Sequence, residues 1–148
     1  MRLRRTTGND ASFIALTRQL DAELRAEYGA AQDQYAPFNL VDTDTAIVAT
    51  VDDVAVGCAC FKRFDDEAVE LKRFFVEPAH RGSGVARAVL AELEAWAREL
   101  GYRAAVLETG TRQLAALAFY AREGYARIPL YGPYVGMELS ICMRKPLV

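Results

Sequence analysis

The stretch RFFVEPAHRGSGVARAVLAELEAW, residues 73–96, contains the change of pattern on which the fold depends. Its first part is aromatic and apolar, as in a buried strand. The middle carries Pro78, His80 and the glycine-rich run from Arg81 to Gly84. From Val85 the apolar residues recur every three or four positions, which indicates an amphipathic helix. The sequence therefore predicts a strand, a glycine-rich loop and a helix in direct succession.

A loop of this kind suits an anion. The first backbone amides of a helix lack intrahelical partners, and the helix dipole places positive charge at the same end. Glycines let a phosphate group approach that backbone. A plain connector would show the same pattern, with Ser83 or Gly84 as the helix cap and Arg81 as a solvated charge. The loop alone leaves both interpretations open.

Two common phosphate loops can be tested by spacing. The nucleoside triphosphate loop needs Gly-Lys-Ser or Gly-Lys-Thr, and the chain has neither. The dinucleotide fingerprint is closer, because GSGVAR begins like it and Glu108 ends the next predicted strand, loosely where a ribose-binding acid would lie. Arg87 occupies its third glycine position, however, and too little chain remains for a doubly wound sheet. The spacing excludes the first loop and disfavours the second.

The residues before the loop indicate a helix followed by antiparallel strands. A short edge strand around Leu3 precedes a helix over residues 11–28, with Asn9 or Asp10 as its N-cap and Gly29 at its end. Residues 30–42 have no period, which indicates a loop with room for one short helical turn. Three β-rich runs, separated by Asp52-Asp53 and by Asp65-Asp66-Glu67, then indicate an antiparallel meander up to residue 76.

After the loop, the pattern alternates between helix and strand. The helix that starts at Val85 is expected to end at Gly101, with YRAAVLETG as a short buried strand behind it. A second helix, RQLAALAFYAREG, ends at Gly124, and the tail MELSICMRKPL alternates like a final strand. This order requires at least one parallel crossover on a sheet that began antiparallel.

Composition narrows the function. The 148 residues, 52% hydrophobic, are expected to form a single domain spanning 1–148. A net charge of −2 argues against nucleic acid and anionic membranes as partners. The start MRLRRTTGND lacks an apolar signal region, so we expect a cytoplasmic protein. Cys58, Cys60 and Cys142 lie in apolar runs and read as buried thiols, and with His80 they match no zinc module, so no metal is expected.

Two segments carry a family resemblance. VEPAHRGSGVARAVL resembles motif A of the GNAT superfamily of N-acetyltransferases, whose pattern is Gln/Arg-x-x-Gly-x-Gly/Ala. QLAALAFYAREGY resembles motif B of the same superfamily, with Gln113 in place of the usual Asn. The positions in register are Arg81, Gly84 and Ala86 in motif A, and Ala116, Phe119, Tyr120, Gly124 and Tyr125 in motif B. Two motifs at the right separation, within a matching order of elements, are far more specific than one loop.

The resemblance implies an α+β fold in three layers. A mixed, mostly antiparallel sheet of six to seven strands would be flanked by helices, with the parallel crossover at the cofactor loop. It also implies acetyl-CoA as cosubstrate and transfer to an amine of a small molecule, amino acid or peptide, by direct attack in a ternary complex. A non-catalytic acyl-CoA binding or sensing module on the same fold is the alternative, and a homodimer is left open. The expected cofactor contacts are Phe75, Val76, Arg81, Gly82, Ser83, Gly84, Val85, Ala86, Gln113 and Phe119.

The implied chemistry needs a base and an acid. An amine with an ordinary pKa of about 10.4 must lose a proton before it attacks a thioester. Glu70 is the first candidate for the base, Glu108 is the second and water is a third, although Glu70 fits an outward-facing polar residue or ion-pair partner equally well. Tyr120 stands where family members protonate the departing thiolate. Tyr131 and Tyr134, in the connection to the last strand, are expected substrate contacts.

Overall fold

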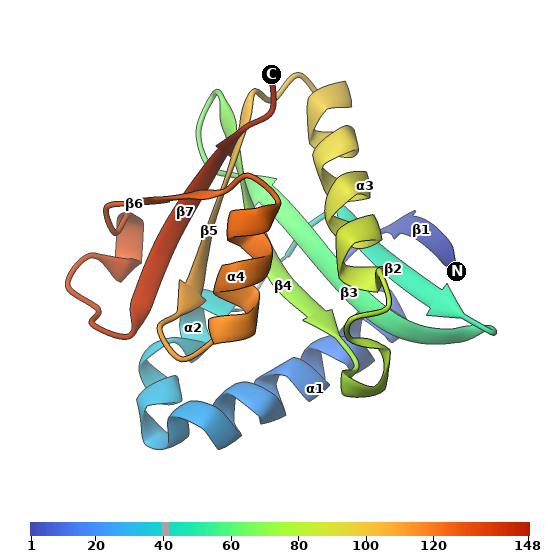
Figure 1. The fold of residues 1–148 in the computed structure, drawn as a ribbon, viewed down its shortest axis with the longest axis horizontal. Coiled ribbons are helices and arrows are strands. Elements are labelled where there is room, and N and C mark those ends of the chain that lie inside the picture. Colours follow the sequence, from blue (N-terminus) through green and yellow to red (C-terminus); the bar gives the residue numbers. More distant parts are fainter. Residues whose placement is uncertain (40–41) are drawn as a thin grey trace.

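A computed structural model of the chain describes residues 1–39 and 42–148. Within these residues a seven-stranded sheet runs in the order β1-β2-β3-β4-β5-β7-β6, and every neighbouring pair is antiparallel except β4 and β5 (Figure 1). This confirms the predicted mixed sheet with one parallel crossover. The strands are β1 (Arg2–Thr6), β2 (Ala46–Val51), β3 (Val54–Arg63), β4 (Ala68–Val76), β5 (Ala104–Gly110), β6 (Ala126–Ile128) and β7 (Ser140–Pro146).

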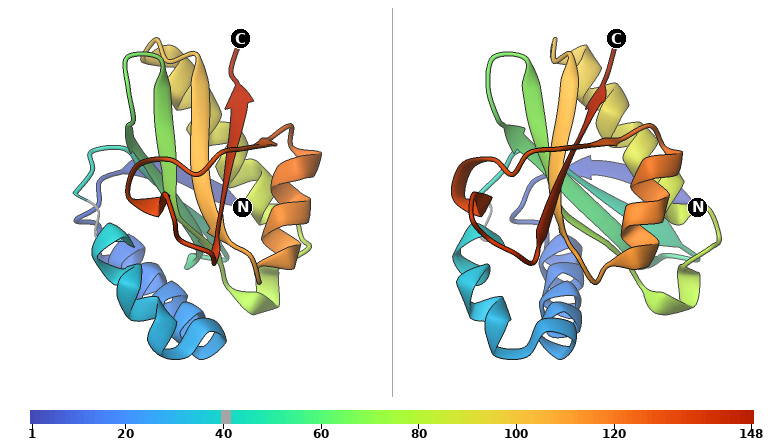
Figure 2. Two further views of the ribbon diagram at one scale, coloured as in Figure 1. Left: turned by 90° about the vertical axis from the view of Figure 1, so that its left-hand side faces the viewer. Right: turned by 60° about the vertical axis from the view of Figure 1, so that its left-hand side comes forward.

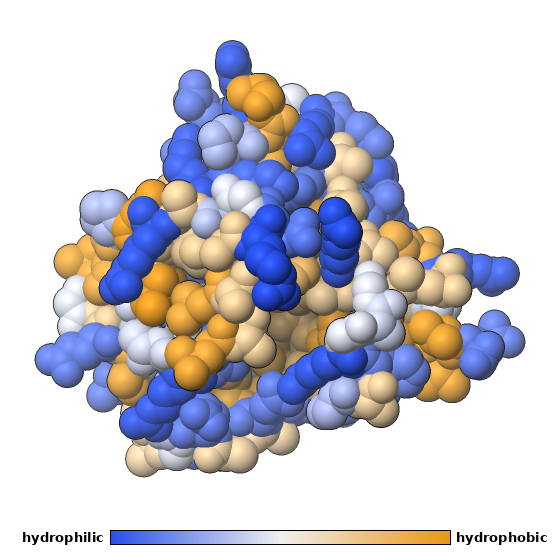
Figure 3. Space-filling view, in the orientation of Figure 1, coloured by the Kyte–Doolittle hydropathy of each residue, from blue (hydrophilic) through white to orange (hydrophobic). Residues whose placement is uncertain are grey.

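Helices cover both faces of the sheet. Helices α1 (Ala11–Tyr28) and α2 (Ala36–Asn39) lie on one side, and α3 (Val85–Glu99) and α4 (Leu114–Arg122) lie on the other (Figure 2). The larger apolar cluster packs α3 and α4 on the sheet, and a smaller one packs α1 on its opposite face. Seen from the direction of Figure 1, the surface is hollowed above α1, and apolar residues line much of the hollow (Figure 3).

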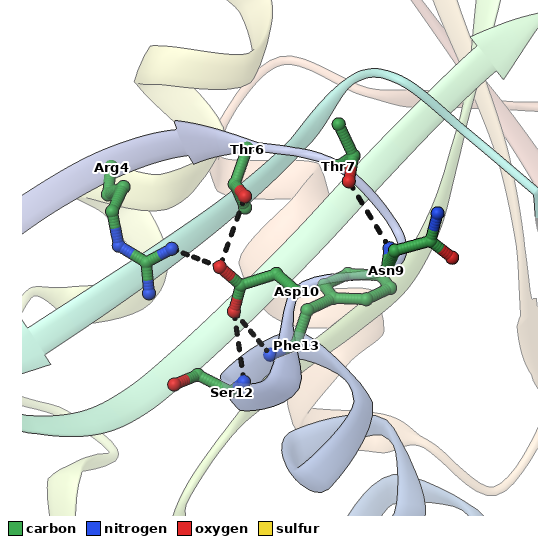
Figure 4. Close-up of polar contacts among 7 residues, drawn as sticks. All are labelled: Arg4, Thr6, Thr7, Asn9, Asp10, Ser12 and Phe13. Carbon is green, nitrogen blue, oxygen red and sulfur yellow. Dashed lines mark hydrogen bonds and ion pairs between the residues drawn. The ribbon is translucent and has the colours of Figure 1, made fainter.

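The first helix shows how well local signals fix an element. It spans the residues predicted, and of the two candidate caps Asp10 is the one used. Its Oδ1 accepts the backbone N–H groups of Ser12 at 2.9 Å and Phe13 at 3.1 Å (Figure 4). Its Oδ2 accepts the Thr6 hydroxyl at 3.1 Å and pairs with Arg4 of β1. One carboxylate therefore caps the helix and ties it to the edge strand.

Replacement of Asp10 by Ala is expected to lower the free energy of unfolding by about 1–2 kcal/mol, because the cap bonds and the link to β1 are lost together. Desolvation favours the protonated acid, but the bonds from Arg4, Phe13 and Thr6 outweigh it and lower the pKa of Asp10. Its contribution is therefore complete above the unfolded pKa of about 3.9 and disappears as the pH falls through the lower folded value. Urea melts at pH 7 and pH 2.5 should show the difference between the two proteins shrinking at the lower pH.

Other boundaries depart from the predictions in detail. The segment predicted as a loop, residues 30–42, is more helical than expected, because it holds most of a 3₁₀ turn, Gly29–Gln34, as well as α2. Its residues 40 and 41 lie outside the described residues. Helix α4 spans Leu114–Arg122, so it is shorter than the predicted helix RQLAALAFYAREG. Strand β6 was not predicted separately, because three residues are too few to show alternation, and pairing with β7 defines it.

The three cysteines are buried and free, as predicted. The thiols of Cys58 and Cys60 point at backbone carbonyls of β4, and burial raises the pKa of each to about 12. They are therefore unreactive core residues near neutral pH. No helix in the described part of the chain combines the length and the apolar character that a membrane crossing would need.

The parallel ladder between β4 and β5 ends before either strand does. Its pairs run from Ala68–Ala104 to Leu71–Leu107, whereas β4 continues to Val76 and β5 to Gly110, and the two strands diverge (Figure 1). At this point Arg73 takes a positive φ of 58° and the register with β3 shifts, so β4 carries a bulge. The buried Arg73 side chain bonds α1 through the Thr17 carbonyl at 2.9 Å and Asp21 at 2.7 Å. Helix α1 thus holds the bulge beside the opening.

Candidate active site

Tyr120 lies beside the opening between β4 and β5, on the face that α3 and α4 cover. Its ring meets Phe74 of β4 edge-on, with centroids 5.9 Å apart, and it also contacts Phe119 and Tyr125. Burial raises the pKa of Tyr120 well above 10, so its hydroxyl stays protonated at neutral pH. The site proposed from motif B therefore places a neutral hydrogen-bond donor next to the end of the ladder.

The glycine loop follows β4 directly. A 3₁₀ turn over Pro78–His80 leads to Gly82 and Gly84, whose φ values of 78° and 91° favour glycine. Helix α3 begins at Val85 without a side-chain cap, and the Gly84 carbonyl accepts the first helical bond, from Ala88. A side-chain carbon at Gly84 would meet no heavy atom within 4 Å. The first amides of α3 are thus uncapped at an open glycine, as an anion site requires.

Arg81 and Ser83 act within the loop. The Arg81 Nε donates to the Val76 carbonyl at 2.9 Å, and its guanidinium pairs with Glu23 of α1 at 2.7 Å and lies over the Phe75 ring. The Ser83 hydroxyl donates to the His80 carbonyl. Arg81 is therefore a brace between β4, the loop and α1 rather than a free cation, and the backbone amides are the stronger anion ligands.

Two buried polar atoms near these motifs lack partners. Among the described residues, His80 Nδ1 and Gln113 Oε1 have no hydrogen bond. Gln113 immediately precedes α4, and Phe119 on that helix packs against Phe74 with ring centroids 5.9 Å apart. A buried acceptor without a donor is costly unless a ligand or water satisfies it. Both atoms are consistent with a polar ligand along the loop and α4.

The two candidate carboxylates, Glu70 on β4 and Glu108 on β5, lie on the opposite face of the sheet from Tyr120. Alternation requires this, because Leu71 and Leu107 belong to the cluster under α3. Glu70 is buried and already engaged, since it accepts the Tyr131 hydroxyl at 2.7 Å and has lysine nitrogens 3.7 and 3.9 Å away. Its position matches the ion-pair interpretation of the sequence as well as the catalytic one.

Glu108 is less constrained. It accepts one hydrogen bond, 2.7 Å from the Ser140 hydroxyl on β7. Burial raises the pKa of Glu108 to about 6 with a further small contribution from Glu70, while Ser140 and Lys72 act in the opposite direction. A carboxylate whose pKa lies near 6 is well suited to accept a proton near neutral pH.

The two tyrosines predicted as substrate contacts pack beside Glu70. Tyr134 is 2% exposed, and its hydroxyl accepts the Lys72 ammonium at 3.3 Å. Tyr131 contacts Tyr134 edge-on and donates to Glu70. Sequence reasoning missed Lys72, which is buried between these groups with its pKa lowered by desolvation, because a strand lysine normally reads as solvated.

A pocket opens next to Glu108. It is open to solvent, and its lining residues are Leu24, Tyr28, Gln32, Tyr35, Glu108, Gly110 and Leu139. Gly110 is required for its shape, because a side-chain carbon there would overlap the Tyr28 hydroxyl. That hydroxyl accepts the Arg112 backbone N–H at 3.1 Å and so ties the end of α1 to the end of β5. The sequence signal for this contact was a glycine in a predicted strand, which marks close approach of another group.

Comparison with known proteins agrees with this geometry. The sequence profile of the acetyltransferase (GNAT) family matches residues 13–125. The chain belongs to the GNAT family. A relative from Azospirillum brasilense named IAA acetyltransferase is 34% identical over 145 residues, which cover 92% of this chain and 91% of that protein. Human N-acetyltransferase 8 is 34% identical over 85 residues, or 54% of this chain and 37% of the human one.

Solved structures show the same GNAT architecture. A protein from Klebsiella pneumoniae, provisionally assigned as an acyl-CoA N-acyltransferase, has a TM-score of 0.83 and 34% identity, covering 99% of this chain and 97% of its own. A GNAT acetyltransferase from Elizabethkingia anophelis with acetyl-CoA bound has a TM-score of 0.68 at 17% identity, covering 98% of this chain and 97% of its own, so it shares the fold. The predicted family and fold class are confirmed.

Proposed function

We propose that residues 1–148 form one acetyltransferase domain that moves the acetyl group of acetyl-CoA to an amine of a small molecule, amino acid or peptide. One observation carries this proposal: the β4–β5 ladder stops at Leu71 and Leu107, with Tyr120 on one face of the opening and Glu108 on the other. The attack is direct, within a ternary complex, and needs no metal. The domain works in the cytoplasm.

The acetyl-CoA site is assigned to the loop and to the edge of β4. The amides from Gly82 to Ala86, uncapped at the start of α3, are suited to the pyrophosphate. The backbone of Phe75 and Val76 lies beyond the last β5 pair. Apart from the Val76 carbonyl, which Arg81 occupies, its main-chain groups on that edge are therefore open to the pantetheine arm. Gln113 and Phe119 contribute from the start and face of α4, where the unpaired Gln113 oxygen is an acceptor for a ligand N–H group.

The residues divide the proton transfers between them. Glu108 accepts a proton from the acceptor nitrogen, which then attacks the thioester carbonyl and forms the new C–N bond. The tetrahedral intermediate collapses as the C–S bond breaks. The departing sulfur takes the proton of Tyr120, and the nitrogen loses its second proton to water. A proton from water then restores Tyr120, and Glu108 releases its own proton to solvent. Glu70 acts on Glu108 through its charge and holds Tyr131 in place.

Replacement of Tyr120 by Phe tests the site. We expect kcat to fall roughly 10- to 100-fold with little change in KM for acetyl-CoA, because the ring contacts remain and only the donor for the sulfur is lost. The measurement is thiol release from acetyl-CoA over a panel of amines. Tyr125→Phe is the matched control, since Tyr125 contacts the Tyr120 ring but bonds the structural Glu94 at 2.8 Å. That variant should lose stability and keep its kcat.

Two results would count against these assignments. Full kcat in Tyr120→Phe would remove the phenol from the mechanism. Tight binding of acetyl-CoA by the unsubstituted protein, without thiol release on any amine of the panel, would contradict the transferase itself and favour a binding module on the same fold.

A further inference from the structure

The pocket beside Glu108 has a distinctive lining. Its walls are two leucines, Leu24 and Leu139, and two tyrosines, Tyr28 and Tyr35, with Glu108 as the charged group. None of its lining residues in the described part of the chain carries a positive charge. An apolar, aromatic cavity with one acidic group suits an ammonium attached to an apolar body. Among the described residues, its lining offers no cation to pair with a carboxylate.

The nearest cations do not alter this chemistry. The guanidinium of Arg112 lies over the ring of Tyr28, but the residue is exposed and donates to the Glu27 carbonyl at 3.0 Å. The Lys72 ammonium acts on Glu108 but is engaged with Tyr134 at 3.3 Å and Glu70 at 3.9 Å. Neither belongs to the pocket lining. Both are thus committed to groups other than a molecule in the pocket.

Neutral polar groups complete the pocket. Gln32 is 7% exposed and lines it, and no hydrogen bond joins its side-chain amide to another described residue. It can therefore donate to or accept from a hydroxyl or ring N–H of a bound molecule. The close approach of Tyr28 to Gly110 sets the width at the end of β5 and leaves an aromatic wall there. The polar contacts available to the far end of a ligand are uncharged.

We propose that this pocket selects, as acceptor, a primary amine on an aromatic or branched apolar body that carries no carboxylate. The inference rests on the proposed function and narrows its acceptor. The ammonium lies at Glu108, where the proton must be removed, and the body lies between Tyr28, Tyr35 and the leucines. An α-amino acid would bring its carboxylate close to Glu108, into a cavity where no lining residue offsets the charge.

Three ligands of similar size separate the effect of the carboxylate charge from the effect of its bulk. Binding of 2-phenylethylamine, L-phenylalanine and L-phenylalaninamide to the whole protein is measured by calorimetry at pH 7 with saturating coenzyme A, which cannot transfer an acetyl group. We expect 2-phenylethylamine to bind at least 10-fold more tightly than L-phenylalanine. The affinity for L-phenylalaninamide should be close to that for 2-phenylethylamine, because the amide group adds bulk without adding a negative charge.

A charge placed in the pocket provides the converse test. In Leu139→Arg, the affinity for L-phenylalanine relative to 2-phenylethylamine should rise at least 10-fold, and Leu139→Met, which keeps the site neutral, should leave the ratio as it was. Leu24→Arg tests the same point from α1 if the first variant does not fold. The ratio of two affinities in one protein is insensitive to a general loss of stability.

Binding and turnover distinguish the two proposals. Equal affinity for L-phenylalanine and 2-phenylethylamine in the unsubstituted protein would overturn the inferred acceptor class, even if amino acids were acetylated and the transferase stood. If the protein binds 2-phenylethylamine 10-fold more tightly than L-phenylalanine but acetylates no amine, the inferred selectivity would be supported and the transferase contradicted.

Discussion

Replacement of Glu108 by Gln is expected to lower kcat/KM by roughly 100- to 10,000-fold, the usual contribution of a positioned general base. The exchange keeps the shape of the side chain, and the amide oxygen can still accept the Ser140 hydroxyl, which lies 2.7 Å from the carboxylate. What is lost is the ability to take a proton. The loss should appear in kcat as well as in kcat/KM, because the proton is transferred during the chemical step.

The dependence of kcat/KM on pH is a more specific test of Glu108 as the base. Burial raises the pKa of Glu108 to about 6, opposed by Ser140 and Lys72 and reinforced by Glu70. The active form is the carboxylate, so kcat/KM should rise tenfold per pH unit below about 6 and level off above it. In Glu108→Gln the break near pH 6 should vanish, and kcat/KM should instead rise up to the pKa of the amine, because only an amine that has already lost its proton can attack.

Glu70→Gln separates the two carboxylates. The amide oxygen of the substituted side chain can still accept the Tyr131 hydroxyl, so the local packing is kept. Because the charge of Glu70 raises the pKa of Glu108, its removal should move the acidic limb to lower pH without abolishing it. A break near pH 6 that survives in Glu108→Gln and disappears in Glu70→Gln would assign the base to Glu70 instead.

Local patterns predicted most of the fold because their causes are local. Each signal acts within about one helical turn. Examples are the Asp10 side chain that caps α1, the spacing of apolar residues after Val85, and the glycines at 82 and 84 that precede α3. The motifs then placed Tyr120 on a particular element, and its contact with Phe74 agrees with that placement.

The candidate acceptor pocket could not be predicted in the same way. Its walls join the end of α1 to the end of β5, so Tyr28 and Gly110 meet across more than 80 residues of chain. Nothing near Gln32 or Leu139 in the sequence indicates that they share a cavity. Arg81 illustrates the same limit, because its pairing with Glu23 depends on where α1 lies.

Substitutions at Gly84 are expected to affect acetyl-CoA binding more strongly than any other change in the loop. The residue has a φ of 91° and open space around it, so a side chain there meets solvent or the ligand but not the fold. Asn and Asp are the informative pair, since they have the same shape and tolerate positive φ better than other residues, yet only Asp carries a charge. Their difference isolates electrostatics at the start of α3.

The expected order of affinity for acetyl-CoA is Gly84, then Asn, then Asp. Asn should weaken binding about 10-fold through strain and bulk, and Asp should weaken it by a further factor on the order of 100, because two like charges about 4 Å apart repel by a few kcal/mol near a protein surface. Calorimetry at 0.05 M and 0.5 M salt checks this, since screening should shrink the gap between Asp and Asn and leave the gap between Asn and Gly. Equal affinities for the two variants at low salt would mean that the pyrophosphate lies elsewhere, and the uncapped amides of α3 would then have no part in holding the cosubstrate.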